Sequence, residues 1–434
     1  DRRTTDSTHA MKTSLTNWDR TAWARSTLML LLVIASATAQ NWVQRSASSP
    51  SGRNTDSAYN VYNGTTTIFG GYGGPSILSD ETWEWDGVDW TQRVTVTRPA
   101  ARASHSMAFD SNRNRVMLFG GRAGALHFGD TWEWDGLGWT QQVVAAAPPA
   151  RSNASMTYDD SRNVVVLFGG LDSTGVLLDD TWEWNGVQWI QRLPANKPSP
   201  RMRASMTWDN VRNEAVLFGG GDGNSVFAET WTYDGVTWTF HTPNSSPPAR
   251  WDADMVFDGN CGAAILYGGA ADTSWALNLA DAWQWDGSDW QVVVGTTPPA
   301  RHGHVMSFDA QRGETLIWGG RDAVTPPTGG FLTDSWIRAA LCTRSMTLLN
   351  PVVVGQPFSV RYDYPPSATL NFCLTLLTGH QPSAFPVPIP GMPSIGLARV
   401  DIFNILLQPA ALLDGSGSLT QTFSVPYNQS AFSG

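Results

Sequence analysis

The chain has 434 residues, 41% of them hydrophobic and 15% charged, and its formal net charge is −10 at pH 7. This length allows about two or three domains, each large enough to bury a core. An acidic chain without basic runs argues against nucleic acid or an anionic membrane as a partner, so we expect neither.

The N-terminal segment, residues 1–39, is typical of an export signal. Residues 1–10 precede Met11 and look like translated upstream sequence. A positively charged lead is followed by the apolar run Leu28–Ile34 and by an A-x-A cleavage site that ends at Ala39. The apolar run is too short for a membrane anchor, which needs about 20 residues, and no later segment could span a membrane. The sequence predicts cleavage after Ala39 and a secreted, cell-surface or periplasmic protein.

Hydrophobic runs that end in two adjacent glycines recur along the chain at spacings of 49 to 51 residues. A period of this size, built from short β-rich runs, is typical of a propeller, in which each repeat forms one blade. Six copies predict six blades. The glycine pairs are Gly70-Gly71, Gly120-Gly121, Gly169-Gly170, Gly219-Gly220, Gly268-Gly269 and Gly319-Gly320.

Other residues recur with the glycines. An arginine stands 18 residues before each of the last five pairs, and Arg53 is a slightly displaced first copy. An acidic residue and, two positions later, a tryptophan follow each pair, and several copies continue as WEWDG-x-x-W. The five arginines are Arg102, Arg151, Arg201, Arg250 and Arg301, and the acid–tryptophan couples are Glu81/Trp83, Asp130/Trp132, Asp180/Trp182, Glu229/Trp231, Asp281/Trp283 and Asp334/Trp336.

Each repeat predicts four strands, a to d, arranged as two hairpins. Ser104–Gly121 gives two β-rich runs around a polar turn, which we assign to strands a and b. Thr82–Gln92 gives strands c and d, with Asp86-Gly87 as the positive-φ turn of a tight hairpin. Of the 22 tryptophans, 16 occupy repeated positions, so we expect them in the core between blades and not on a sugar-binding surface.

A hydrophobic run, a double glycine, an aromatic residue and a spaced tryptophan resemble the Kelch repeat. Over residues 41–340, the chain resembles secreted bacterial Kelch-repeat proteins, which are related in fold to the central domain of galactose oxidase. The resemblance implies an all-β chain whose residues 40–340 form a six-bladed Kelch-type β-propeller.

The ends of the repeat region predict how the ring closes. The repeated pattern ends after Trp336 in the sixth repeat, which has no DG hairpin and no strand-d tryptophan. Near the N-terminus, the segment Asn41–Arg45 is similar to the strand-d run Asp89–Arg93. We expect this segment, which contains Trp42, to pair as strand d of blade six and so to cover an open edge.

The repeated arginines have two interpretations. In the favoured one, each arginine pairs with the acid of the repeat, and the network holds the blades in register. In the alternative, the arginines form a cationic channel mouth for acidic sugars. The residues just after each arginine are not repeated, and they begin strand a, which we expect to line the channel.

Variation between repeats is concentrated in the b–c loops. The two hairpin turns are uniform, whereas the distance from glycine pair to tryptophan runs 12, 11, 12, 11, 14 and 16 residues. Variable loops on a scaffold usually carry function, so we expect a ligand site near the longest b–c loops, Ala270–Ala280 and Arg321–Thr333. The alternative is that these loops are ornamental and the channel side chains merely solvated. The candidate ligand-binding residues are Trp275, Arg321, Asp322, Trp251, Asp252, Arg203, His105, His302 and His304.

No catalytic motif stands out, since the sequence has no Ser-His-Asp pattern, P-loop, HExxH or sialidase box. The copper ligands of galactose oxidase cannot be carried over, because no repeat tyrosine stands beside a plausible cysteine. Asp252 and Asp254 could form a carboxylate pair for glycoside cleavage, although this spacing is common on any strand. We therefore predict no catalytic residues, no metal and no cofactor.

These observations favour an exported, monomeric, non-catalytic scaffold that binds an extracellular protein or polysaccharide through the face of the b–c loops. Two alternatives stay open. One is a carbohydrate-active hydrolase, lyase or oxidase with its site in the propeller channel, and the other is a purely structural envelope component.

From about residue 341 the repeat stops, and β-like runs between Pro/Gly turns predict a small β-sandwich-like module at 341–434. Cys342 and Cys373 are placed to form a disulfide after export. Cys261 lies in an a–b turn where other repeats carry arginine, and we expect a free thiol there. The β-like runs are Thr347–Pro351, Phe358–Tyr364, Leu370–Leu377 and Leu419–Val425.

Overall fold

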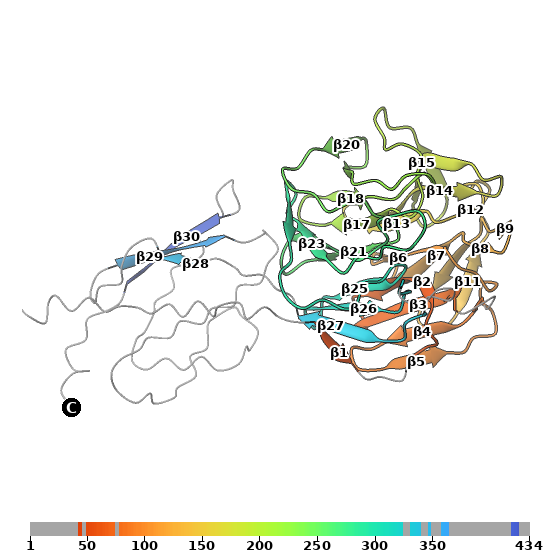
Figure 1. Ribbon diagram of the computed structural model, residues 1–434, viewed down its shortest axis with the longest axis horizontal. Coiled ribbons are helices and arrows are strands. Elements are labelled where there is room, and N and C mark those ends of the chain that lie inside the picture. The colour runs from red at the N-terminus through yellow and green to blue at the C-terminus, as the bar shows by residue number, and fades with distance from the viewer. Residues whose placement is uncertain are drawn as a thin grey trace, which may run out of the picture. The chain divides into compact units, whose positions relative to one another are not determined.

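The computed structural model describes residues 42–45, 49–73, 78–323 and 330–339, and three strands nearer the C-terminus. Residues 42–339 form six antiparallel sheets, one for each repeat, which confirms the predicted all-β, six-bladed propeller (Figure 1). The innermost strands of neighbouring blades contact one another in a closed cycle, in the order β2, β6, β13, β17, β21, β25 and back to β2.

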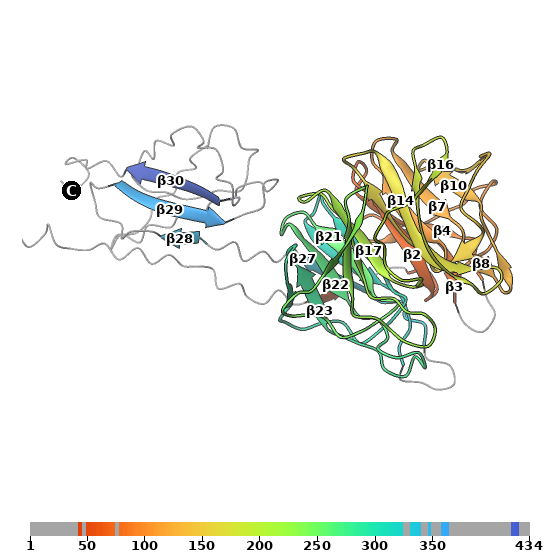
Figure 2. The same cartoon turned by 90° about the horizontal axis from the view of Figure 1, so that it is seen from above.

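Each blade contains strands a to d in the predicted order. In Figure 2 the strands β21, β22 and β23 of blade 5 can be followed side by side. Blades 1 to 3 consist of β2 (Asn54–Asn60), β3 (Thr65–Tyr72), β4 (Thr82–Trp85) and β5 (Trp90–Arg93); β6 (Ser106–Asp110), β7 (Arg115–Phe119), β10 (Thr131–Trp134) and β11 (Trp139–Gln142); and β13 (Ser155–Asp159), β14 (Val164–Asp172), β15 (Leu177–Trp184) and β16 (Trp189–Arg192). Blades 4 to 6 consist of β17 (Ser205–Asp209), β18 (Glu214–Phe218), β19 (Thr230–Tyr233) and β20 (Trp238–His241); β21 (Asp254–Asp258), β22 (Ala263–Tyr267), β23 (Ala282–Trp285) and β24 (Trp290–Val292); and β25 (Val305–Asp309), β26 (Glu314–Trp318), β27 (Ser335–Ala339) and β1 (Val43–Arg45).

Three short strands extend this pattern on the side of the b–c loops. β12 (Arg151–Ser152) pairs with β14 in blade 3. β8 (Arg122–Ala123) and β9 (Leu126–His127) form a small ribbon within the b–c loop of blade 2.

The ring closes as the sequence predicts. β1 pairs antiparallel with β27, with Val43 opposite Ile337, so the N-terminal strand is the fourth strand of blade 6 (Figure 1). Trp42 is buried, and its ring centroid lies 6.1 Å from that of Tyr267 in blade 5. An otherwise open sheet edge is therefore covered by a strand from the far end of the chain.

The double glycines lie where neighbouring blades approach most closely. The second glycine of each pair donates its N–H to the backbone carbonyl of the next blade's arginine, at 2.8 to 3.1 Å. The first glycine has a positive φ, and a Cβ there would lie 2.4 to 3.0 Å from the same carbonyl oxygen. Only glycine meets both requirements, which explains why the pair recurs in every repeat.

The repeated arginines form the predicted ion pairs, but within blades. Each guanidinium contacts the acid of its own blade at 2.5 to 2.8 Å, as in Arg102–Asp130, and also donates to the carbonyl of the first glycine. Register between blades is set instead by the arginine's backbone carbonyl. All six side chains are buried, so the alternative of a cationic mouth built from these arginines is wrong.

The repeated tryptophans lie mainly in the core between blades. The strand-d tryptophans are 5% exposed or less, and five of the six donate Nε1–H to a hydroxyl at the start of strand c in the preceding blade, at 2.8 to 3.2 Å. One of these bonds, from Trp90 to Ser335, joins blade 1 to blade 6. The sixth tryptophan, Trp42, has no such partner among the described residues.

Arginine side chains in the a–b turns pack against a glycine in the c–d turn of the next blade. A Cβ placed on Gly186 would lie 1.9 Å from Nε of Arg113, so the guanidinium lies directly against the glycine. Arg162, Arg212 and Arg312 lie in the same way against Gly235, Gly287 and Gly87.

In blade 5 the arginine of this turn is replaced by Cys261, which is disulfide-bonded, so the expectation of a free thiol was wrong. An arginine is not required at this position because of the structure of the next blade. Blade 6 receives its fourth strand from β1, so its described residues contain no c–d turn glycine that an arginine could contact. Cys342 and Cys373 lie outside the described residues.

Towards the C-terminus, β28 (Met346–Leu348), β29 (Pro357–Asp363) and β30 (Ser418–Ser424) form an antiparallel three-stranded sheet in that order. Three of the four predicted β-like runs therefore overlap strands, and the fourth, Leu370–Leu377, lies outside the described residues. This sheet and the propeller belong to different compact units.

Candidate functional site

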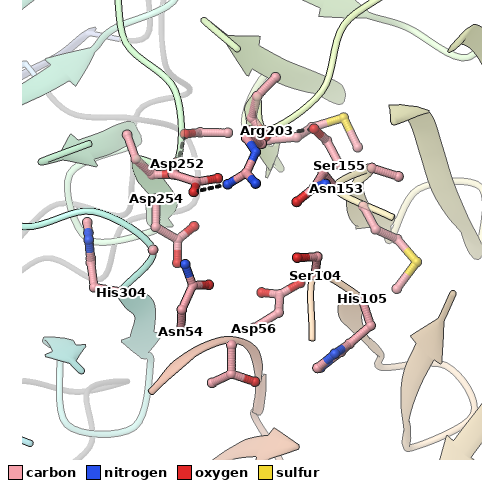
Figure 3. A pocket seen from close by; sticks show the side chains of 18 residues that line it. Asn54, Asp56, Ser104, His105, Asn153, Ser155, Arg203, Asp252, Asp254 and His304 are labelled. Carbon is pink, nitrogen blue, oxygen red and sulfur yellow. Dashed lines mark hydrogen bonds and ion pairs between the residues drawn. The ribbon is translucent and has the colours of Figure 1, made fainter. Parts of the chain in front are cut away.

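A central cavity of about 120 Å³ lies where the first strands of all six blades meet (Figure 3). Its lining consists of the residues that follow each repeated arginine, as the sequence predicts for the channel. Polar side chains that line it include Asn54, Asp56, Ser104, Asn153, Ser155, Arg203, Ser205, Asp252 and Asp254.

A relay of backbone hydrogen bonds runs around this cavity from blade 2 to blade 6. The N–H of Asn153 donates to the carbonyl of Ser104 at 2.8 Å, and Arg203, Asp252 and Gly303 repeat the bond in turn at 2.8 to 3.1 Å. All five residues have φ between 48° and 61°. For Arg203 this left-handed conformation is costly, since its side chain gains nothing locally from it.

Trp275, on the b–c loop of blade 5, contacts residues from three blades. Its ring stacks on Trp251 of blade 5, with centroids 4.7 Å apart and an interplanar angle of 16°. The ring of His302 in blade 6 lies 4.6 Å away, and the guanidinium carbon of Arg203 in blade 4 lies 4.7 Å from the Trp275 ring centroid. Trp275 also has φ of 64°, which is rare for a bulky side chain.

Arg203 links this aromatic cluster to the cavity. Its guanidinium forms an ion pair with Asp252, which Figure 3 marks with a dashed line, and lies 5.6 Å from the ring centroid of Trp251. The Nε of Arg203 is buried and has no hydrogen-bond partner within the part of the chain that the structure describes. The sequence-predicted residues Trp251, Asp252, Trp275 and Arg203 thus lie together at one place.

His302 connects the cluster to the b–c loop of blade 6. Its Nδ1 lies 3.0 Å from Oδ1 of Asn278, whose Nδ2 donates to the carbonyl of Arg321. Burial lowers the pKa of His302 to about 4, so the ring is neutral at pH 7. The Arg321 guanidinium lies 5.4 Å from the ring centroid of Phe331, and Asp322 accepts the N–H of Gly330, so both are placed farther out on the loop.

His105 and His304 are placed differently from the other candidates. They line the cavity wall, but their rings pack edge-on against Phe69 and Tyr267 of the preceding blades, at 5.8 and 5.3 Å. Burial and the nearby repeated arginine lower the pKa of His105 to about 3 and hold the pKa of His304 well below its usual range. Both rings therefore act as neutral packing groups between blades.

Besides Asp252, two buried carboxyls line the cavity, and sequence reasoning missed one of them. Asp56 and Asp254 occupy the repeat position held by serine in blades 2 to 4. Each accepts a backbone N–H from the next blade, Asp56 from Met107 at 2.7 Å and Asp254 from Met306 at 2.6 Å. The surrounding protein removes most of their hydration, which raises the pKa of Asp56 to about 7 and that of Asp254 well above its usual range. Aligning the six repeats position by position would have found Asp56.

The suggested pairing of Asp252 with Asp254 is wrong, because Asp252 binds Arg203 and both oxygens of Asp254 accept backbone N–H groups. Within the described part of the chain, no group of three or more His, Cys, Asp or Glu residues is placed to hold a metal ion. The same part contains no helix long and apolar enough to cross a membrane.

Comparison with known proteins supports the repeat assignment. Residues 134–291, which run from the end of strand c in blade 2 to strand d of blade 5, match the KLHDC2/KLHL20/DRC7 Kelch-repeats domain. No curated protein matches the chain. Together, the matched repeats and the six antiparallel sheets support a Kelch-type β-propeller.

Proposed function

We propose that this chain is an exported, non-catalytic scaffold that binds an extracellular partner through the b–c face of its propeller. The observation that carries the proposal is the cluster of Arg203, Trp275 and His302, three unrepeated side chains from three successive blades that meet on this face. The export signal expected at residues 1–39 lies outside the described residues and supplies the extracellular part of the proposal.

The two faces of the propeller differ in what their residues do. On the a–b and c–d face, repeated arginines lie against turn glycines, so these side chains serve the ring itself. On the b–c face, the loops differ in length and carry side chains that the other blades lack. Recognition is the ordinary role of such loops on a rigid scaffold.

A protein is a better fit to this face than a polysaccharide. Sugar rings bind by stacking on an open aromatic face, but Trp251 is only 4% exposed, and the ring of Trp275 already contacts Trp251, His302 and Arg203. The exposed apolar side chain of Leu277, on the same loop as Trp275, suits a protein surface instead.

A loop exchange tests the proposal. The chain from Gln40 is used to capture proteins from the native cell surface and is screened in parallel on a glycan array. In a variant, residues 270–280 are replaced by the shorter blade 4 loop, residues 221–228, which already joins equivalent strands. The control is Val236→Ser on the opposite face, where the side chain is 77% exposed.

The proposal predicts that a specific protein is captured by the parent chain and by the control, and is lost by the loop variant. Capture that persists after the loop exchange would place the site elsewhere. Retention of glycans alone, with loss in the loop variant, would keep the face but make the partner a polysaccharide.

A carbohydrate-active enzyme is the second candidate, and the observation that favours it is the pair of cavity carboxyls Asp56 and Asp254. Burial raises the pKa of both carboxyls, that of Asp56 to about 7, which is the direction that a general acid requires. Against this, their oxygens already accept backbone N–H groups that join successive blades. Turnover of a polysaccharide that is abolished by Asp56→Asn or Asp254→Asn would establish the enzyme.

A further inference from the structure

The contacts of Arg203, Trp275 and His302 indicate which chemical group of a partner would bind on the b–c face. This inference rests on the proposed function. We propose that Trp251, Trp275 and Asp252 form a cation cage, that Arg203 occupies it in the free protein, and that a guanidinium or ammonium side chain of the protein partner takes its place on binding. The name cage refers to these three residues throughout.

The geometry of the cage is that of a cation site. Two indole rings stack with a 16° interplanar angle, and a guanidinium carbon lies 4.7 and 5.6 Å from their centroids. The carboxylate of Asp252 forms an ion pair with the same guanidinium. The guanidinium lies beside this stack, and an aromatic ring and a carboxylate next to a single cation give both electrostatic attraction and a charged hydrogen bond.

Arg203 fills this cage imperfectly. Its Nε is buried without a partner, which costs free energy that a differently placed guanidinium or ammonium need not lose. The backbone φ angles are 61° at Arg203, 48° at Asp252 and 64° at Trp275. The first two angles recur at the equivalent position of blades 2 to 6, whereas that of Trp275 belongs to the cage alone, and backbone strain of this kind is typical of ligand-binding sites.

The charges around the cage favour a cation over an anion. The carboxylate of Asp252 lines the cavity beside the cage, and Arg203 is the one arginine in the described lining. His302, at the edge of the cage, is neutral at pH 7 because burial lowers its pKa to about 4. The net charge of −10 also draws basic partners towards the chain.

Emptying the cage by substitution provides the first test. Arg203→Gly removes the occupant, and glycine suits the local backbone, since Gly303 stands at the equivalent position of blade 6 with φ of 59°. Arg203→Asn is the second variant, chosen because Asn153 stands at the equivalent position of blade 3 with φ of 56°. Binding of methylguanidinium to the full chain is followed by tryptophan fluorescence and by the shift in Tm.

The expected result is that methylguanidinium binds Arg203→Gly roughly tenfold more tightly than the parent chain, because Arg203 no longer competes. Adding Trp275→Ala or Asp252→Asn to Arg203→Gly should abolish this binding. Equal, weak binding by Arg203→Gly and by both double variants would overturn the cage, and Arg203→Asn repeats the comparison if the glycine variant is unfolded.

The partner itself provides the second test. Methylguanidinium should compete with the captured protein for the parent chain, and Trp275→Ala alone should weaken capture at least tenfold. Capture that depends on the 270–280 loop but resists both treatments would refute the cage and leave the scaffold function standing. If no protein is captured, the proposed function fails, and the methylguanidinium experiment still decides whether the cage binds cations.

Discussion

Replacing Ala282 by threonine should stabilise the propeller, because it completes a hydrogen bond that the ring closure lacks. In blades 1 to 5, the strand-d tryptophan donates Nε1–H to a threonine or serine at the start of strand c in the preceding blade. Trp42, the strand-d tryptophan of blade 6, packs with Ala282 at this position, and its Nε1 has no partner among the described residues.

The size of the effect follows from the burial of both residues. Trp42 is 5% exposed and Ala282 is 1% exposed, so water cannot replace the missing acceptor. A buried unsatisfied N–H costs about 1–3 kcal/mol, and a new hydrogen bond should recover about 1–2 kcal/mol of it. Threonine or serine fits the same buried position in every other blade, so little overpacking is expected. For a domain of this size, the gain should raise Tm by roughly 2–4 °C.

The assay is thermal and urea unfolding of Ala282→Thr beside Ala282→Val, which adds the same bulk without the hydroxyl. The threonine variant should be the more stable by about 1 kcal/mol or more. In a Trp42→Phe background, which removes the donor, the difference between threonine and valine should vanish. Equal stability of the two variants with Trp42 intact would refute the reasoning.

Three further predictions concern other parts of the ring. Gly186→Ala should destabilise the protein more than Gly136→Ala in equilibrium unfolding, because the two glycines have nearly equal φ (91° and 92°) and only Gly186 lies against an arginine; equal losses would argue against that contact. Reduction should lower Tm of the parent chain, by an amount equivalent to roughly 3–5 kcal/mol, but leave Cys261→Ser unchanged; a reduction-sensitive serine variant would place the disulfide elsewhere. Asp56→Asn should gain stability relative to the parent chain as pH rises from about 4 to 7, followed as the difference in Tm; a constant difference would contradict the raised pKa.

The direction of this last effect follows from proton binding. Folding raises the pKa of Asp56 from 3.8 to about 7, so between these values the folded state binds more protons and the Asp56 contribution to stability falls as pH rises. His105 acts in the opposite direction, because folding lowers its pKa from 6.5 to about 3 and its contribution is lost as pH falls below 6.5. Comparing Asp56→Asn with the parent chain at each pH cancels the histidine term.

Much of the fold could be predicted because the same structural requirements recur in six repeats of the sequence. The double glycine, its arginine and the paired acid showed where each blade begins and ends. The WTQR-like segment around Trp42 identified the strand that closes the ring. The repeated pattern did not reveal which blade each contact joins. Arg102 and Asp130 look like a link between blades in sequence, yet the ion pair lies within blade 2.

The features that could not be predicted from the sequence are those that depend on contacts with a residue of a neighbouring blade. Asp56 differs from Ser106 only when the repeats are aligned across a one-residue deletion near Arg53, and the deletion obscured it. Cys261 seemed a neutral substitution because the role of arginine at that turn, to hold the next blade's glycine, cannot be seen without the structure. His105 and His304 seemed to face the channel, but strand geometry turned both rings towards the blade interface.

The repeated residues stabilise the ring, and this explains why unrepeated residues of the candidate site can adopt unfavourable backbone conformations. The repeated glycine–arginine bonds and buried tryptophans join every pair of neighbouring blades, so the ring does not depend on any single further contact. Blades 4 to 6 can therefore hold Arg203 and Trp275 in unfavourable backbone conformations at a cost that the rest of the ring easily offsets. A contact that the scaffold does not need for its stability is one that a partner is free to replace, and Arg203 in its cage is such a contact.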